Sequence, residues 1–220
     1  MSTDSRGPHQ GQPVKLAGLP LQNARAAMIL VHGRGATAES ILTLVPALDV
    51  EGFAFLAPQA SGNTWYPNSF LAPVPSNEPG ITSGLRAIGD VMDAVNAAAI
   101  PAERTIILGF SQGACLSLEY TARNAKRYGG IACLSGGLIG PDGTPRDYAG
   151  SYDGTPAFLG CSDIDGHIPA ARVLESGAVL ERMGAKTTVK LYPGMGHLVN
   201  EDEIQHVRVL MQGVLEASRA

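Results

Sequence analysis

The sequence has few cysteines, few aromatic residues and few charges. The three cysteines, Cys115, Cys133 and Cys161, include no Cys-x-x-Cys pair. Their spacing excludes a disulfide framework and a cysteine-based zinc site, and their apolar neighbours predict buried free thiols. The five histidines form no His-Glu-x-x-His pattern. Asp163 and Asp165 alone would make a poor metal site, so we predict that no metal is bound.

Charge is also sparse and evenly spread. Charged residues make up 16% of the chain, the net charge is -4, and the lysines and arginines form no basic stripe, so we expect no nucleic-acid partner. The hydrophobic content of 45% suffices for one large core. Residues 1–13 are polar and rich in glycine and proline, without a secretory signal or membrane span. We predict a disordered tail over residues 1–13, a single domain over residues 14–220, and a cytoplasmic location.

Short β-favouring runs alternate with segments of helical periodicity along the chain. This alternation predicts an α/β fold with a mostly parallel sheet, helices on both faces, and ligands at the carboxyl ends of the strands. The predicted strands are Ala27–Val31, Phe53–Ala57, Thr105–Leu108, Gly130–Leu134, Ala157–Gly160 and Thr187–Tyr192. The predicted helices are Ala38–Leu48, Gly84–Ala99, Ser111–Asn124, Pro169–Met183 and Asp202–Ala217. Of the irregular stretches between them, we predict that Gln59–Ser83 is functional and that Gly136–Gly154 lies on the surface.

Residues Gly109 to Gly113 read Gly-Phe-Ser-Gln-Gly and follow an apolar run. This pattern is typical of a strand-to-helix turn that presents a nucleophilic serine, here Ser111. The two glycines let strand and helix pass closely. A helix beginning at the serine places the backbone N–H of Gln112 where developing negative charge is stabilised. The alternative is an ordinary turn in which Ser111 caps the helix.

A nucleophilic serine needs a general base that an acid orients. In folds of this class the acid follows a later strand and the histidine follows the last one. His197 fits the second position, because it ends the run Gly-Met-Gly-His after the strand Thr187–Tyr192. Asp163 and Asp165 both follow the strand Ala157–Gly160, and the residues themselves leave the choice between them open.

A second donor to an oxyanion is expected after the strand Ala27–Val31, where residues His32 to Gly35 read His-Gly-Arg-Gly. The backbone N–H of Arg34 is the candidate. Its side chain is either a substrate-facing cation or a solvated loop residue, and we favour the second. The stretch from Gly33 also matches a loose dinucleotide fingerprint. A nucleotide site needs an acidic residue after the next strand, and the sequence has Ala57-Pro58 there.

Five segments in order along nearly the whole chain resemble the phospholipase/carboxylesterase family of α/β-hydrolases, which includes acyl-protein thioesterases. They are Leu30 to Gly35, Trp65 to Pro67, Gly109 to Gly113, Asp165 to Pro169 and Gly194 to His197. The resemblance implies an α/β-hydrolase fold that needs no cofactor, and it suggests a homodimer. The chain has no insertion long enough to form a cap domain.

The resemblance also separates the two aspartates. In that family the acid stands four residues before a proline, which selects Asp165, four residues before Pro169, over Asp163. Gly166 stands where the family usually has proline, so this loop is expected to be less rigid.

The implied reaction is a two-step acyl transfer through Ser111, with His197 as base. Asp165 orients the base, and the N–H groups of Arg34 and Gln112 hold the oxyanion. The implied acyl-contact residues are Trp65, Tyr66 and Leu71, the alternative being that this loop packs on the core. Small or exposed acyl esters are the expected substrates. Two alternatives remain: a ligand-binding protein of the same fold without chemistry, and a hydrolase that acts on lactones or carbon–carbon bonds.

Overall fold

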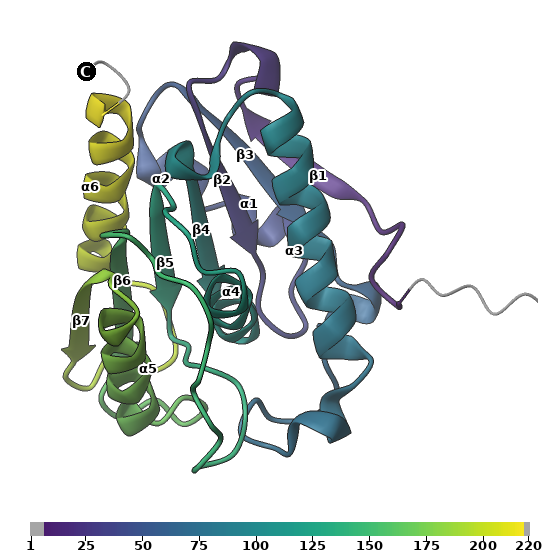
Figure 1. Ribbon diagram of the computed structural model, residues 1–220, viewed down its shortest axis with the longest axis vertical. Coiled ribbons are helices and arrows are strands. Elements are labelled where there is room, and N and C mark those ends of the chain that lie inside the picture. The colour runs from purple at the N-terminus through teal and green to yellow at the C-terminus, as the bar shows by residue number, and fades with distance from the viewer. Residues whose placement is uncertain (1–6, 218–220) are drawn as a thin grey trace, which may run out of the picture.

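The computed structural model describes residues 7–217, and Figure 1 shows a sheet with helices in front of it and behind it. Within this range, seven strands form one sheet in the order β1-β3-β2-β4-β5-β6-β7. β1 is antiparallel to β3, and every other neighbouring pair is parallel. The strands are β1 (Val14–Gly18), β2 (Ala26–Val31), β3 (Phe53–Pro58), β4 (Thr105–Phe110), β5 (Gly130–Leu134), β6 (Pro156–Ser162) and β7 (Lys186–Tyr192).

The helices divide between the two faces of this sheet. One face carries α1 (Ala38–Leu42), α2 (Val45–Leu48) and α6 (Glu201–Ala217). The other carries α3 (Gly80–Ala97), α4 (Gln112–Arg123) and α5 (Ala170–Arg182). The prediction of a mostly parallel sheet covered on both faces is confirmed. No cap domain covers the strand ends in the described part of the chain.

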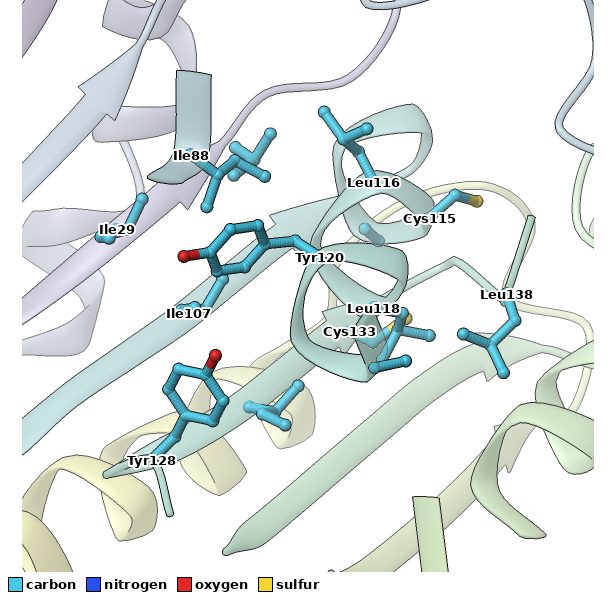
Figure 2. Close-up of a cluster of buried hydrophobic side chains, with 14 of the residues drawn as sticks. Ile29, Ile88, Ile107, Cys115, Leu116, Leu118, Tyr120, Tyr128, Cys133 and Leu138 are labelled. Atoms are coloured by element: carbon cyan, nitrogen blue, oxygen red, sulfur yellow. The ribbon is translucent and has the colours of Figure 1, made fainter. Parts of the chain in front are cut away.

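The central strands are buried on both faces, which explains their continuous apolar runs. All residues of β2 are buried, and they alternate between the two cores. Ile29 belongs to the core on the side of α3, α4 and α5, whereas Met28 belongs to the core on the side of α1, α2 and α6. Figure 2 shows part of the core on the side of α3, α4 and α5, where the Tyr120 side chain of α4 points toward Ile107 of β4.

The largest differences from the predicted elements are a split helix, a helix that begins earlier and an additional strand. The segment Ala38–Leu48 forms two short helices, because Pro46 lies in the first turn of α2 and has no N–H to continue α1. α3 begins at Gly80 rather than Gly84. β1 was not predicted; it is a short edge strand with exposed and part-buried residues in alternation.

Residues 7–13 pack against the domain, so the prediction of a disordered tail is wrong for them. His9 is only 4% exposed. Its ring bonds the Trp65 carbonyl oxygen through Nε2 at 2.8 Å and accepts the Ser61 N–H at Nδ1 at 3.1 Å. Its backbone N–H donates to Ser83 Oγ at 2.9 Å. Hydrogen bonds hold this segment against the domain. Its sequence has no hydrophobic periodicity from which this packing could be predicted. Residues 1–6 lie outside the described residues.

The segment Gly136–Gly154, predicted at the surface, begins inside the core. Leu138 and Ile139 are buried. The buried guanidinium of Arg172 in α5 donates from Nη1 to the carbonyl oxygens of Leu138 and Gly140, at 2.9 and 2.6 Å. A charged side chain therefore satisfies the backbone of a buried stretch without regular structure, which composition alone does not reveal.

α6 begins with reciprocal bonds between side chain and backbone. Asn200 Oδ1 accepts the Glu203 N–H at 2.9 Å, and Glu203 Oε2 accepts the Asn200 N–H at 3.0 Å. Glu203 is fully buried, and among the described residues its Oε1 has no hydrogen-bond partner. Burial raises the pKa of Glu203 from 4.5 to about 7.

We expect Glu203→Gln to flatten the pH dependence of stability. The native state keeps a proton on Glu203 that the unfolded chain releases near pH 4.5, so wild-type stability falls as pH rises from 4.5 to about 7. Glutamine stays neutral and still accepts the Asn200 N–H. Relative to wild type, the variant should gain up to roughly 3 kcal/mol of unfolding free energy over this range. Urea unfolding from pH 4.5 to pH 8 measures the gain, and parallel curves would contradict it.

Candidate active site

Loops that follow four parallel strands meet at one cavity. They follow β2, β4, β6 and β7 and carry Arg34, Ser111, Asp165 and His197. The carboxyl ends of parallel strands share one edge of a sheet, which is why residues far apart in sequence converge there. The cavity has a volume of about 390 Å³, and Arg34, Ser111 and His197 all line it.

Ser111 stands on a strained turn between β4 and α4. Its backbone has φ 55° and ψ −121°, a conformation that side-chain-bearing residues rarely adopt. A Cβ on Gly109 would overlap the Gly113 carbonyl, and a Cβ on Gly113 would overlap the Val31 carbonyl at the end of β2. Both glycines are therefore required for strand and helix to pass this closely.

His197 lies between Ser111 and Asp165. Its Nε2 is 2.8 Å from Ser111 Oγ, and its Nδ1 is 2.6 Å from Asp165 Oδ2. The other oxygen of Asp165 accepts the backbone N–H groups of His167 and Ile168, at 2.8 and 3.1 Å. The Asp165 side chain is 0% exposed, and that of His197 is 23% exposed. The imidazole is thus partly open to solvent, next to a buried carboxylate.

Opposing effects act on the carboxyl group of Asp165. Burial raises its pKa, but the hydrogen bonds from His197 and from two backbone N–H groups outweigh burial and hold the pKa below 3.8. An ionised carboxylate at this position accepts the Nδ1–H of His197. The Nε2 atom is then left to accept a proton from the Ser111 hydroxyl. The arrangement can therefore generate a nucleophilic serine oxygen.

Asp163 contacts the loop that carries the imidazole. Its Oδ1 accepts the Gly194 N–H at 2.8 Å, and Ser162 Oγ accepts the Gly196 N–H at 3.1 Å. The His197 ring also packs against Phe110, with 5.1 Å between the ring centroids. The end of β6 thus supplies Asp165 to the imidazole and, through its neighbours, holds the loop before His197.

Gln112 connects the helix start to the loop after β3. Its side chain is buried. Oε1 accepts the Trp65 N–H at 2.9 Å, and Nε2–H donates to the Tyr66 carbonyl at 2.8 Å. Its backbone N–H, the expected oxyanion donor, belongs to the first residue of α4, where the helix dipole favours negative charge. The two side-chain hydrogen bonds, called the Gln112 clamp below, hold the loop that forms the cavity wall. The same residue also provides a backbone N–H at the helix terminus.

Arg34 is exposed but not merely solvated. Its guanidinium lies across the loop, where Nη1 donates to the Pro67 carbonyl at 2.8 Å and Nη2 donates to the Asn68 carbonyl. Its Cζ lies 5.9 Å from the centroid of the Tyr66 ring. Arg34 is thus an exposed loop residue, as expected, and backbone carbonyls of the cavity wall also hold its side chain.

Of the three residues expected to contact an acyl group, only Tyr66 lines the cavity. Trp65 lies behind the wall with 0% exposure and donates its ring N–H to the His32 carbonyl at 2.9 Å. Leu71 packs against the core. Phe70 and Ile168 line the cavity instead. For Trp65 and Leu71 the structure thus matches the alternative that the loop packs on the core.

Several histidines have roles that the sequence did not specify. His32 is buried; its Nδ1–H donates to the Gly33 carbonyl at 2.8 Å and its Nε2 accepts the Ala60 N–H at 3.1 Å. Burial lowers the pKa of His32 and of His9, so both act as neutral links to the loop after β3. His167 lines the cavity, with its ring edge-on to His197 at 4.9 Å. The position of His167 two residues after Asp165 was the sequence feature from which its place in the cavity wall could have been predicted.

The other features of residues 7–217 concern metal binding, cysteine thiols and membrane-spanning helices. Within this range, no group of three or more His, Cys, Asp or Glu side chains is arranged to hold a metal ion. The prediction of buried free thiols at Cys115, Cys133 and Cys161 is confirmed. None of the helices described here has the length and apolar character needed to cross a bilayer.

A family model described as phospholipase/carboxylesterase matches residues 19–214, which include every residue of the site. The chain belongs to this family. The family assignment supports a hydrolase function, and it confirms both the resemblance and the α/β-hydrolase fold.

Individual relatives agree with this assignment. The chain is similar to the crystal structure of a phospholipase/carboxylesterase from Dyadobacter fermentans, with 44% identity, a TM-score of 0.88, and coverage of 91% of this chain and 96% of the other. A protein of Arabidopsis thaliana named "Probable carboxylesterase SOBER1-like" is 25% identical over 89% of this chain and 81% of its own length. An acyl-protein thioesterase 1 of Debaryomyces hansenii is 30% identical over 53% of this chain and 51% of its own length.

Loss of the Gln112 clamp should destabilise this member of the phospholipase/carboxylesterase family. Gln112→Leu would leave the buried Trp65 N–H and Tyr66 carbonyl without their partner, at an expected cost of about 2–4 kcal/mol of unfolding free energy. Urea unfolding measures this cost. The matched control is Gln212→Leu, at an exposed position of α6, which should change stability little. Equal effects of the two substitutions would show that the clamp contributes nothing.

Proposed function

We propose that the protein is a serine carboxylesterase or thioesterase that hydrolyses small or exposed acyl esters through an acyl-enzyme intermediate. The observation that carries this proposal is the continuous relay from the Asp165 carboxylate through His197 to Ser111 Oγ, with contacts of 2.6 and 2.8 Å. Family membership supports the same reaction class. A binding protein of this fold would have no use for such a relay, so we favour the enzyme.

In the first half-reaction, His197 Nε2 accepts the Ser111 proton as Oγ attacks the carbonyl carbon. The imidazolium that forms is stabilised by the ionised Asp165 carboxylate at Nδ1. His197 then donates the proton to the leaving alcohol or thiol as the acyl-serine ester forms. In the second half-reaction, water loses its proton to His197, attacks the acyl-serine and releases the acid.

The negative charge on the carbonyl oxygen needs fixed donors. We assign this role to the backbone N–H groups of Gln112 and Arg34. Gln112 begins α4 directly after the nucleophile. Arg34 follows Gly33, at which a Cβ would lie 3.3 Å from Ser111 Cβ, so the loop after β2 passes close to the reacting oxygen.

The cavity supports a small acyl group as substrate. Its volume is about 390 Å³, and Tyr66, Phe70 and Cys115 are among the residues that line it. With no cap domain over this edge in residues 7–217, bulky alcohol or thiol portions can extend outward. The cytoplasmic location and the homodimer stay predictions from the sequence.

Labelling with a fluorophosphonate probe tests the nucleophile. We expect covalent modification at Ser111, located by mass spectrometry, and none in Ser111→Ala. His197→Ala should slow labelling strongly, because the serine hydroxyl is a weak nucleophile without its base. A folded wild-type protein that resists the probe would refute the proposed mechanism and favour a binding role.

Matched substitutions of Asp165 and Asp163 test which aspartate orients His197. Asp165→Asn should lower kcat about 10⁴-fold on a 4-nitrophenyl ester or an acyl thioester, because an amide favours the wrong imidazole tautomer. Asp163→Asn should have a much smaller effect, since the Asp163 side chain contacts the Gly194 N–H and not the imidazole. Similar losses in both variants, measured by steady-state kinetics on samples with matched thermal unfolding, would exclude the assignment of Asp165.

A further inference from the structure

Arg34 is a cation in the wall of the cavity without an acidic partner. Among the described residues, none of the ion pairs includes it. Both groups that hold its guanidinium, the carbonyls of Pro67 and Asn68, are neutral. A guanidinium has five N–H donors, so these two bonds leave donors for another acceptor.

The two aspartates after β6 bind other groups. Asp165 uses one oxygen for His197 and the other for backbone N–H groups, and Asp163 accepts the Gly194 N–H. No Asp or Glu is among the residues that line the cavity. The wall therefore presents one permanent positive charge and no compensating negative charge. Arg172, also a cation of this region, differs because it is buried and paired with Asp142 and Glu175.

The Arg34 guanidinium is fixed in position. Its two carbonyl acceptors belong to the same wall, and the Tyr66 ring lies beside it, with 5.9 Å from Cζ to the centroid. A positioned guanidinium loses less conformational freedom on binding an anion than a free side chain does, and its planar fork matches a carboxylate. Because Arg34 and Ser111 line one cavity, a substrate bound to Ser111 can present its own anion to this fork.

We propose that the Arg34 side chain selects esters whose acyl portion ends in a negatively charged group, such as the half-esters of dicarboxylic acids. The proposal rests on the esterase function proposed above and narrows its substrate class. The acyl carbonyl oxygen faces the backbone N–H groups of Arg34 and Gln112, and the terminal carboxylate of the acyl chain faces the Arg34 guanidinium. One residue thereby binds both ends of the acyl group.

Two substrates of equal size test the proposal. Mono-4-nitrophenyl adipate carries a terminal carboxylate, and 4-nitrophenyl adipamate carries a neutral amide in its place. For wild type, kcat/KM should be roughly tenfold higher for the carboxylate at low ionic strength, as expected for one charge-assisted hydrogen bond. Added sodium chloride should reduce this preference, because the guanidinium is exposed and its charge is screened.

Variants then assign the preference to Arg34. Arg34→Gln keeps a hydrogen-bond donor for the wall but removes the charge, and the ratio of the two kcat/KM values should fall to about one. Arg34→Lys keeps the charge without the planar fork and should retain part of the ratio. The ratio is the measured quantity, so a change in oxyanion stabilisation common to both substrates cancels.

A wild-type ratio near one would overturn the proposal whether or not the variants fold. A wild-type preference that survives in a folded Arg34→Gln variant would also overturn it. These results differ from failure of the proposed esterase function, in which neither ester is hydrolysed and the fluorophosphonate probe does not label Ser111. Hydrolysis of both esters at equal rates would leave the esterase standing and reject only the role of Arg34.

Discussion

The site depends on one close approach, where the first turn of α4 passes over the ends of β4 and β2. Gly109 and Gly113 leave no room for a Cβ, and the Val31 carbonyl is the atom that a side chain on Gly113 would meet. This contact forces the strained backbone of Ser111 and brings the loop that carries Gly33 and Arg34 beside it. The positions of the proposed nucleophile and of the proposed oxyanion donors therefore derive from a single packing constraint, and the surrounding buried sheet supports the strain of Ser111.

Neutral polar side chains hold the cavity wall in place. The side chains of His9, His32 and Gln112 are buried and bond backbone groups of the loop after β3. For the two histidines, burial disfavours the protonated form, so both ring nitrogens take part as one donor and one acceptor. A long loop without regular structure is thus satisfied by specific side chains, as buried backbone requires.

Charge is distributed unevenly around this framework. The buried carboxylate of Asp165 is surrounded by donors, and the buried Arg172 is paired and bonded to backbone carbonyls. Arg34 lines the cavity and belongs to none of the ion pairs among the described residues. Charges with a structural role carry partners because an unpaired buried charge is costly. A charge at a cavity wall without such a partner is available to a ligand.

The sequence by itself determined six of the seven described strands and the order of the site segments, because continuous apolar runs, glycine spacing and strand-to-loop positions are local patterns. It placed Ser111, His197 and Asp165 on loops at one sheet edge, and it placed the second aspartate there too. The residues themselves left the choice between Asp163 and Asp165 open, and only the family resemblance favoured Asp165. The tertiary structure shows which side chain contacts His197, since the direction of each side chain depends on the Gly194–His197 loop, about thirty residues away. The division of the segment Ala38–Leu48 into two helices could have been predicted from Pro46. The burial of His9 and Trp65 could not have been predicted from the sequence. Those positions depend on polar contacts between distant segments, and such contacts have no periodicity in the chain.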